Sequence, residues 1–408
     1  MRKISLENTN AAGKQTIKEI NEKLILNLIR ERQPISRAEI AEKTRLQRST
    51  VTIITTRLLQ ENWIYEGENG SVGVGRKPTN LYLNARKFKS LGVQVGREET
   101  LLAVADLNGE ILNQKSLRTD LDARLFTARL GREIERLAGG STDGGKVAGV
   151  GVSLPGYIEK AKGRIIAAEN FGWMNVPLGE WLRQRLVLPV YFENNAKLSA
   201  FAEIWFGDRR HRHPQNFICV TSRDGIGTGI IINGEIYNGA RDGAAEFGHV
   251  SLFPYGERCR CGNYGCWELY ASDMATVKRY RHLKGPARSA RHQAQEITIH
   301  EIIQRAHQGE EAAQSALQTT GKYLGLGIAN LVYGFNPEMV IVGDNLKDAW
   351  DFVGDIIIST VRSRVPAYYL EGLQIVPSSH KENPSLLGAI ALVLAHQFRI
   401  GGNFLKTS

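Results

Sequence analysis

Three of the four cysteines in this 408-residue chain fall within eight residues, and a histidine precedes them by ten positions. Cys259 and Cys261 are separated by one residue, Cys266 follows a glycine-containing turn, and the histidine is His249. Three thiolates and one imidazole complete a tetrahedral ligand set for zinc, which leaves no position for a reacting water. The sequence therefore predicts one structural zinc ion per chain within residues 249–266.

The cysteine distribution also bears on the compartment. Clustered cysteines beside a histidine are typical of metal binding in a reducing cytosol, not of a disulfide framework. The chain starts without an apolar signal-peptide core, and its longest apolar run, within residues 386–395, is too short to cross a bilayer. We therefore expect a cytoplasmic protein without a transmembrane segment. Its length predicts two or three domains.

Positive charge is concentrated at one end of the chain. Residues 1–90 contain 17 Lys and Arg against 9 Asp and Glu, a balance of +8 out of +10 for the whole sequence. A basic terminal segment is typical of a nucleic-acid-binding module. A basic solvated surface with no partner explains charge alone equally well, so the pattern of residues has to decide.

That pattern predicts three short helices in the basic segment. Apolar residues recur at helical spacing through residues 17–29, and Pro34 ends this helix. Ser36 and Glu39 form a capping box that opens a second helix. A third helix is expected over residues 48–61, with an apolar inward face.

The second and third helices have the order and spacing of a helix-turn-helix. In this motif the early residues of the second helix of the pair reach base edges in the major groove of DNA. The corresponding polar and basic positions here are Arg48, Ser49 and Thr52, with Arg57 further along.

A wing completes this predicted domain, to which we assign residues 1–85. Residues 63–65 and 81–83 are expected to form two strands joined by a glycine-rich basic loop, in which Arg76 and Lys77 would contact phosphates or a narrow minor groove. The alternative is a three-helix protein-contact module. Charge, helix order and wing together favour a winged helix-turn-helix that binds double-stranded DNA.

The remaining residues, 86–408, show a different pattern. Strands are expected over residues 91–95, 101–105 and 147–153, with a helix over 123–138 between them. A similar round of hairpin strands, helices and a further strand begins near residue 217. This approximate repetition predicts two α/β lobes around a cleft.

Several motifs of this region resemble those of the ROK family (repressors, open reading frames, kinases). They are GVSLPG at 151–156, NFGW at 170–173, PVYFENNA at 189–196, EFGH at 246–249 and CRCGNYGCWE at 259–268. The resemblance implies the two-lobed sugar kinase and actin-like ATPase fold. It is strongest to the family's sugar-responsive transcriptional regulators.

The chain departs from the kinases of this family where phosphate chemistry takes place. Those kinases begin the first lobe with Asp-x-Gly-Gly-Thr, whereas residues 94–100 read QVGREET, so that Gln94 replaces the Asp and two glutamates precede Thr100. Where the kinases have a catalytic Asp, this chain has Asn195, which cannot accept a proton as a base. Arg223 and Asp224 also stand at the entrance of the second phosphate loop. We therefore expect a protein that is not an enzyme.

The resemblance implies functional residues in the cleft. His249, Cys259, Cys261 and Cys266 would bind zinc. Glu246, His249 and Glu268 would line one side of a sugar site, and Asn194 and Asn195 the other. Carboxylates and amides suit a polyol because each bonds two neighbouring hydroxyls. Two alternatives stay open: Glu268 caps a helix, or Asn194 satisfies a local turn.

The sequence thus predicts a regulator, by resemblance a repressor, of carbohydrate-metabolism genes. Its DNA affinity would be set by a sugar or sugar phosphate bound between the lobes, and it would act as a homodimer or tetramer. One alternative is an active ATP-dependent sugar kinase with an appended DNA-binding arm. Another is a domain sequestered by a partner protein such as a sugar-transport component.

Overall fold

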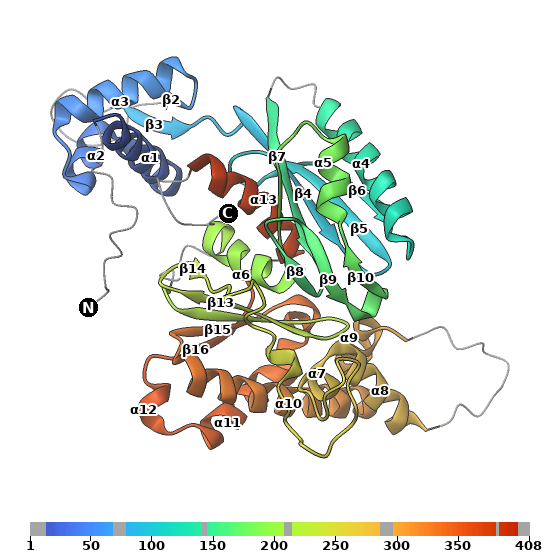
Figure 1. Cartoon of the computed structure of the whole chain (residues 1–408). Coiled ribbons are helices and arrows are strands. Elements are labelled where there is room, and N and C mark those ends of the chain that lie inside the picture. Colours follow the sequence, from blue (N-terminus) through green and yellow to red (C-terminus); the bar gives the residue numbers. More distant parts are fainter. Residues whose placement is uncertain are drawn as a thin grey trace.

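The structure is a computed structural model that describes residues 14–67, 79–140, 145–207, 214–285, 297–380 and 383–398. A small helical domain at the N-terminus lies beside one of two stacked α/β lobes (Figure 1). Arg76 and Lys77 of the predicted wing fall outside the described residues.

The N-terminal domain has the predicted helices and a small antiparallel sheet of order β1-β3-β2. Ser36 accepts a hydrogen bond from the Glu39 amide at 3.3 Å, and the Glu39 carboxylate accepts one from the Ser36 amide at 2.8 Å, which confirms the capping box. Strand β1 was not expected from the sequence. The elements are α1 (Lys14–Arg32), β1 (Ile35–Ser36), α2 (Arg37–Thr44), α3 (Arg48–Gln60), β2 (Ile64–Gly67) and β3 (Asn80–Leu83).

The first lobe is built on a five-stranded sheet of order β11-β7-β4-β5-β6, and a three-stranded antiparallel sheet, β10-β9-β8, lies beside it. Strands β4, β7 and β11 are parallel, while β5 and β6 continue the sheet antiparallel. The lobe contains β4 (Phe88–Val95), β5 (Glu99–Ala105), β6 (Ile111–Arg118), α4 (Ala123–Gly139), β7 (Lys146–Leu154), β8 (Tyr157–Glu159), β9 (Arg164–Ala168), η2 (Glu169–Phe171), β10 (Trp173–Val176), α5 (Leu178–Arg185) and β11 (Val190–Asn194).

The second lobe repeats this topology with the order β14-β13-β12-β15-β16. Its central strand, β12, pairs antiparallel with β13 and parallel with β15, just as β4 pairs with β5 and β7 in the first lobe. The lobe contains β12 (Phe217–Ser222), β13 (Ile226–Ile232), β14 (Glu235–Ile236), η3 (Phe247–His249), α7 (Glu268–Ala271), α8 (Asp273–Lys284), α9 (Ile299–His307), α10 (Glu311–Phe335), β15 (Met339–Val342), η4 (Asp344–Ala349), α11 (Trp350–Arg364), α12 (Ala367–Leu370) and β16 (Gln374–Pro377). The shared strand order confirms the predicted pair of α/β lobes.

Two helices connect the lobes. Helix α6 (Asn195–Phe206) packs against β12 and β13 of the second lobe, and α13 (Pro384–Phe398) packs against β4 and β7 of the first. The helices also pack against each other near the centre of the molecule (Figure 1). Both sequences are rich in apolar and small residues, which allows this close contact. The cleft opens at the start of α6.

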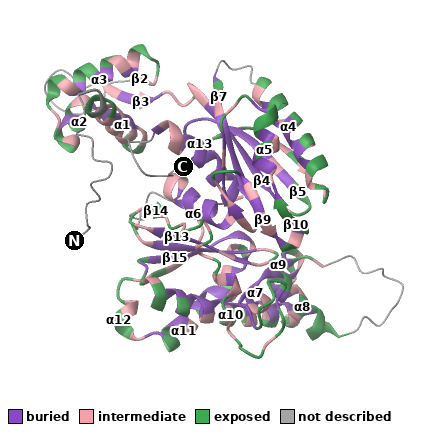
Figure 2. Ribbon diagram, viewed as in Figure 1, coloured by how far each residue is buried: buried purple, intermediate pink, exposed green. Residues whose placement is uncertain are grey.

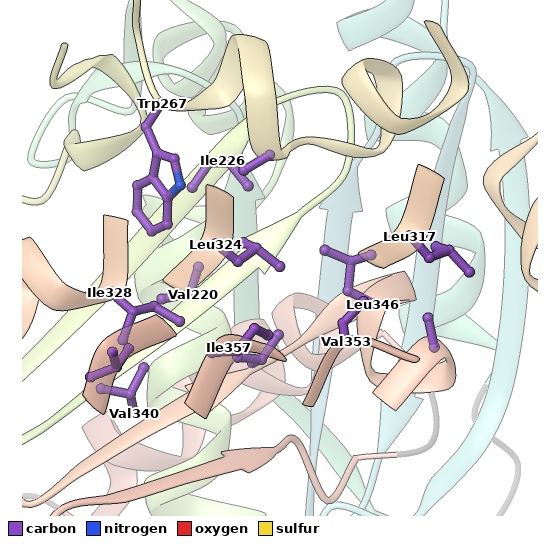
Figure 3. Packing of buried hydrophobic residues seen from close by; sticks show 14 of the residues in the cluster. Val220, Ile226, Trp267, Leu317, Leu324, Ile328, Val340, Leu346, Val353 and Ile357 are labelled. Carbon is purple, nitrogen blue, oxygen red and sulfur yellow. The ribbon is translucent and has the colours of Figure 1, made fainter. Parts of the chain in front are cut away.

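Each lobe has its own buried core, which appears purple in Figure 2. In the second lobe the indole of Trp267 lies among aliphatic side chains that include Ile226, Leu324 and Ile328 (Figure 3). Its Nε1 donates a hydrogen bond to the Tyr323 carbonyl at 2.8 Å. Because Trp267 directly follows Cys266, the core fixes one end of the cysteine cluster. Cys219 is buried among apolar residues.

Candidate zinc centre and sugar-binding cleft

The predicted ligand set comes together at one corner of the second lobe. One ligand atom from each of His249, Cys259, Cys261 and Cys266 lies within 4.8 Å of all the others. His249 Nδ1 is 3.7 Å from Cys259 Sγ, and Cys261 Sγ is 3.7 Å from Cys266 Sγ. These separations match the edge of about 3.8 Å of a tetrahedron with zinc–sulfur bonds of about 2.3 Å. The four residues therefore fit a zinc ion.

The backbone around this corner is tightly constrained. Gly265 has a φ of +66°, and a Cβ atom there would lie 1.6 Å from the Phe253 carbonyl oxygen. An antiparallel β-bridge between Ser251 and Cys266 pairs the segment that carries Cys266 with the extended stretch after His249. Only glycine suits this turn.

The electrostatics of the cluster are also those of a site in which a cation would stabilise the thiolates. Burial raises the pKa of Cys266 to about 11, and the neighbouring Cys261 thiol contributes to this shift. Burial likewise raises the pKa of Cys259, with a further contribution from the Glu268 carboxylate. Thiols in this environment lose their protons readily only when a divalent cation stabilises the thiolates.

The cleft beside this corner has a volume of about 460 Å³, within the usual range of about 300–1,000 Å³ for small-molecule sites. Asn194, Asn195, Glu246, His249 and Glu268 all line it, so the structure brings together every predicted sugar residue. Glu268 Oε1 lies 3.6 Å from His249 Nδ1, and this carboxylate therefore connects the zinc corner to the cleft.

Among these residues Asn194 differs from the sequence expectation. Its Oδ1 accepts hydrogen bonds from the amides of Ala196 at 2.9 Å and Lys197 at 3.3 Å, and so caps α6. Its Nδ2 donates to the Gly156 carbonyl at 2.9 Å. Both polar atoms of the amide are bonded within the protein, so Asn194 positions α6, while the second N–H of its Nδ2 is not used in these bonds. The open alternative for Asn194, a local structural role, is the one the geometry favours.

Sequence reasoning missed a buried charge cluster behind the cleft. Glu193 is fully buried, with Lys160 Nζ 3.8 Å from its Oε2. Lys197 is also buried and donates to the Asp242 carbonyl at 2.6 Å, while Lys160 Nζ lies 3.4 Å from the Asp242 carboxylate. These contacts hold the loop that leads to Glu246 against the first lobe. The available sequence signal was Lys197, a lysine in the otherwise largely apolar α6.

Polar contacts fill the opposite end of the cleft. Arg223 forms an ion pair of 3.0 Å with Asp344, which follows β15. Asp273 accepts hydrogen bonds of 2.7 Å from Ser222 and from Asn345. Burial raises the pKa of Asp273 to about 7, although these two hydrogen bonds oppose the shift. The loops after β12 and β15 are thereby tied together.

The predicted DNA-contacting residues of α3 divide into two groups. Arg48, Ser49 and Thr52 are exposed on its first turns, and Ile53 beside them is 68% exposed. Arg57 instead forms ion pairs with Glu22 of α1 and with Glu61. These ion pairs brace α3 against α1, and a DNA contact by Arg57, whose side chain is 35% exposed, stays a prediction. In the part of the chain that the structure describes, no helix is long and apolar enough to span a membrane.

Two lobes of one strand order around a polar cleft, joined to a helix-turn-helix, define a DNA-binding protein of the sugar kinase and actin-like ATPase fold. The chain belongs to the ROK family, whose model matches residues 90–396. The MarR family model matches residues 18–66, a range that includes the helix-turn-helix.

Similar proteins include both regulators and kinases. The chain is 31% identical to the xylose repressor of Bacillus spizizenii, over 94% of this chain and 97% of the repressor. A solved ROK family transcriptional regulator, a homologue of the E. coli Mlc protein, shares 28% identity over 94% of this chain and 97% of its own, with a TM-score of 0.78. A ROK family glucokinase from Streptomyces griseus, solved with glucose and AMPPNP, shares 29% identity over 74% and 98%, with a TM-score of 0.66.

Proposed function

We propose that this protein is a transcriptional repressor of carbohydrate-metabolism genes whose DNA affinity is set by a sugar bound in the cleft. The observation that carries this proposal is the presence, on one chain, of an exposed polar first turn in α3 and a cleft lined by polyol-binding groups. Similarity to the xylose repressor over 94% of the chain supports it.

In this proposal residues 1–85 bind DNA and residues 86–408 sense the sugar. Zinc bound by His249 and the three cysteines would fix the imidazole ring, so that its other nitrogen faces the cleft. Asn195, Glu246 and Glu268 would then bond the hydroxyls of the sugar. The protein would act in the cytoplasm, where DNA is accessible and thiols stay reduced.

A homodimer or tetramer would place two winged helices on one operator. Sugar binding would change their separation and therefore the half-site spacing that they fit. To move the protein from mostly bound to mostly free, the sugar must prefer one state by about 10⁴-fold, or about 5.5 kcal/mol.

We further propose that the cleft does not transfer phosphate. Asn195 lacks the basicity to take a proton from a sugar hydroxyl, a contribution worth about 10²–10⁴ in rate. The Arg223–Asp344 ion pair joins the two loops between which a nucleotide would lie in the kinases. Asp344 holds a φ of +54°, a conformation that favours glycine, so its side chain stands where a kinase would leave room.

The second candidate is a sugar kinase with an appended DNA-binding arm, which similarity to the Streptomyces griseus glucokinase supports. Purified full-length protein incubated with ATP, Mg²⁺ and a panel of hexoses and pentoses separates the two. We expect ADP release no faster than without sugar. Sugar-dependent turnover would establish the kinase instead.

The DNA-binding role is tested most directly at Arg48. After selection of a binding duplex from random DNA, Arg48→Ala should weaken binding by about 1–3 kcal/mol and relax the base preference at one position. Arg362→Ala, at an exposed position of α11 in the second lobe, is the matched control. An unchanged selected sequence for the Arg48 variant would reject base contact by this residue.

A further inference from the structure

The cleft carries a strong excess of acidic groups. Seven carboxylates line it against three guanidinium groups. The Arg223–Asp344 pair, at 3.0 Å, cancels one group of each kind and leaves six carboxylates against two guanidinium groups. One of those two, Arg260, donates to Asn170 Oδ1 at 2.5 Å. The carboxylates are Glu98, Glu99, Glu169, Asp224, Glu246, Glu268 and Asp344, and the guanidinium groups are Arg97, Arg223 and Arg260.

The acidic groups come from both lobes. Glu246 and Glu268 stand at the zinc corner, where three thiolates and one Zn²⁺ would add a further negative charge. The Asp224 turn, between β12 and β13, adjoins this corner, because a Cβ atom on Gly225 would lie 2.4 Å from Glu268 Oε2. From the first lobe come Glu98, in the turn between β4 and β5, and Glu99, the first residue of β5. A ligand in the cleft therefore meets carboxylates from both lobes.

From this charge distribution we infer that the effector is a neutral, unphosphorylated sugar and that Glu98, Glu99 and Asp224 exclude its phosphate ester. This inference rests on the proposed function, since it concerns the ligand of the same cleft. Hydroxyl groups donate hydrogen bonds to carboxylates, so a neutral polyol gains from the acidic lining. A phosphate monoester carries close to two negative charges near pH 7 and is repelled by it.

The position of the acidic turn makes the selection specific. Suppose that a sugar hydroxyl lies at Asn195. A phosphate group on that hydroxyl would then point toward the two loops that correspond to the phosphate loops of the kinases. Residues 94–100 and the Asp224 turn both border this part of the cleft. Glycines at these positions would offer backbone N–H groups to an anion, whereas the glutamates present carboxylates.

Calorimetric titration of the full chain with matched pairs tests the inference. The pairs are D-glucose and D-glucose 6-phosphate, N-acetyl-D-glucosamine and its 6-phosphate, and D-xylose and its 5-phosphate. We expect at least one neutral sugar to bind 10-fold or more tightly than its ester. A tighter complex with any ester than with every neutral sugar would overturn the inference while leaving the proposed function standing.

The double variant Glu98→Gln/Glu99→Gln gives a second, independent measure. It should strengthen binding of the ester by about 10-fold and leave the neutral sugar within about threefold. Glu311→Gln/Glu371→Gln, at exposed positions of the second lobe, is the matched control and should change neither. Equal effects of the two double variants would overturn the role of the turn. Wild-type protein that binds no sugar of either kind would overturn the proposed function itself.

A separate set of contacts joins the cleft to the DNA-binding domain. Helix α6 begins at the cleft with Asn195 and ends at Trp205 and Phe206. The Arg30 guanidinium of α1 lies 4.1 Å from the centroid of the Trp205 ring and 5.5 Å from that of Phe398. Asn27 of α1 donates to the Phe398 carbonyl at 2.8 Å. The last turns of α6 and α13 thus form one surface against α1.

The rest of this path is closely packed. A Cβ atom on Gly388 of α13 would lie 2.0 Å from the Leu198 carbonyl of α6, so the two helices touch along their backbones. At the other side of α1, Glu22 pairs with Arg57 of the recognition helix α3. A displacement at the start of α6 can therefore be transmitted through a continuous series of packed contacts, from α6 to α1 and from α1 to α3.

We propose that the Trp205–Arg30 contact transmits the state of the cleft to α3. Trp205→Leu in the full chain should leave the sugar affinity and the sugar-free DNA affinity within about threefold. It should reduce the sugar-induced change in DNA affinity by 10-fold or more. Tyr368→Leu, at a 75% exposed aromatic position far from α1, is the matched control.

Arg30→Gln supplies the other half of a double-mutant cycle and covers the case in which the Trp205 variant does not fold. The double variant should lose no more coupling than either single variant. A sugar-induced change in DNA affinity equal to that of the wild type in either folded variant would overturn the proposal.

Discussion

The two ends of the cleft have the same fold around them but opposite chemistry. At the zinc corner, Glu268 and His249 are held beside a metal-ligand set whose geometry is complete. Near the loops after β12 and β15, Arg223 and Asp344 pair with each other. The first region offers polar groups to a ligand, whereas this ion pair is satisfied within the protein. We propose on this basis that the cleft binds a sugar without transferring phosphate.

The largest effect is expected for a substitution that removes one of the zinc ligands. Cys261→Ser should reduce bound zinc from one ion per chain to near zero and destabilise the second lobe by several kcal/mol, because metal binding is coupled to folding. Elemental analysis and thermal unfolding measure both effects. Cys219→Ala, at the cysteine outside the cluster, should retain the metal. One zinc ion per chain in the Cys261 variant would refute the assignment.

The next effect tests whether the opposite end is a filled, buried network. The pKa of Asp273 is raised to about 7 in the folded protein, mainly by burial. A raised carboxyl pKa stabilises the fold fully at pH values below the unfolded pKa near 4, and this stabilisation is lost as the pH rises through 7. The free energy of unfolding decreases by an amount on the order of 4 kcal/mol between these two pKa values.

Asp273→Asn removes this titration. The difference in unfolding free energy between the variant and the wild type should therefore move in favour of the variant between pH 5 and pH 8. Denaturant unfolding at several pH values measures it, and any constant effect of the substitution cancels. A difference that does not change with pH would show that Asp273 is solvated and that its network with Ser222 and Asn345 is not buried.

A smaller effect, on sugar affinity, is expected for a substitution of Glu246 at the zinc-corner end of the cleft. Glu246→Gln should weaken sugar binding by about 1.5–3 kcal/mol, the range for a hydrogen bond to a charged group, while zinc content stays at one ion. Calorimetry with the sugar that stabilises the wild type most is the measurement. Glu180→Gln, at an exposed position of α5, serves as the control. Unchanged affinity in the Glu246 variant would place the sugar elsewhere.

Local features of this structure followed from the sequence. The capping box at Ser36 and Glu39 and the cysteine cluster depend on neighbouring residues, and each formed as expected. The repeat of two sheets was also predictable, because hairpin signals and apolar strands recur along the chain.

Features that depend on distant partners were not predicted. The ion pair of Arg57 with Glu22, 35 residues earlier, was not expected. The hydrogen bond from Asn194 to the Gly156 carbonyl was not expected either, although a local role for Asn194 had been left open. The packing of α13 against the N-terminal domain joins opposite ends of the chain. Such contacts are set by tertiary packing, which periodicity along one segment does not encode.

We propose that a sugar bound at the zinc corner controls DNA affinity without phosphate transfer. Fluorescence anisotropy of a selected duplex, titrated with the full chain at fixed salt and without ATP, tests this most directly. We expect at least a 10-fold change in the DNA dissociation constant when a sugar that stabilises the protein is present at saturation. An identical dissociation constant with every such sugar, or a change that appears only when ATP is consumed, would contradict it.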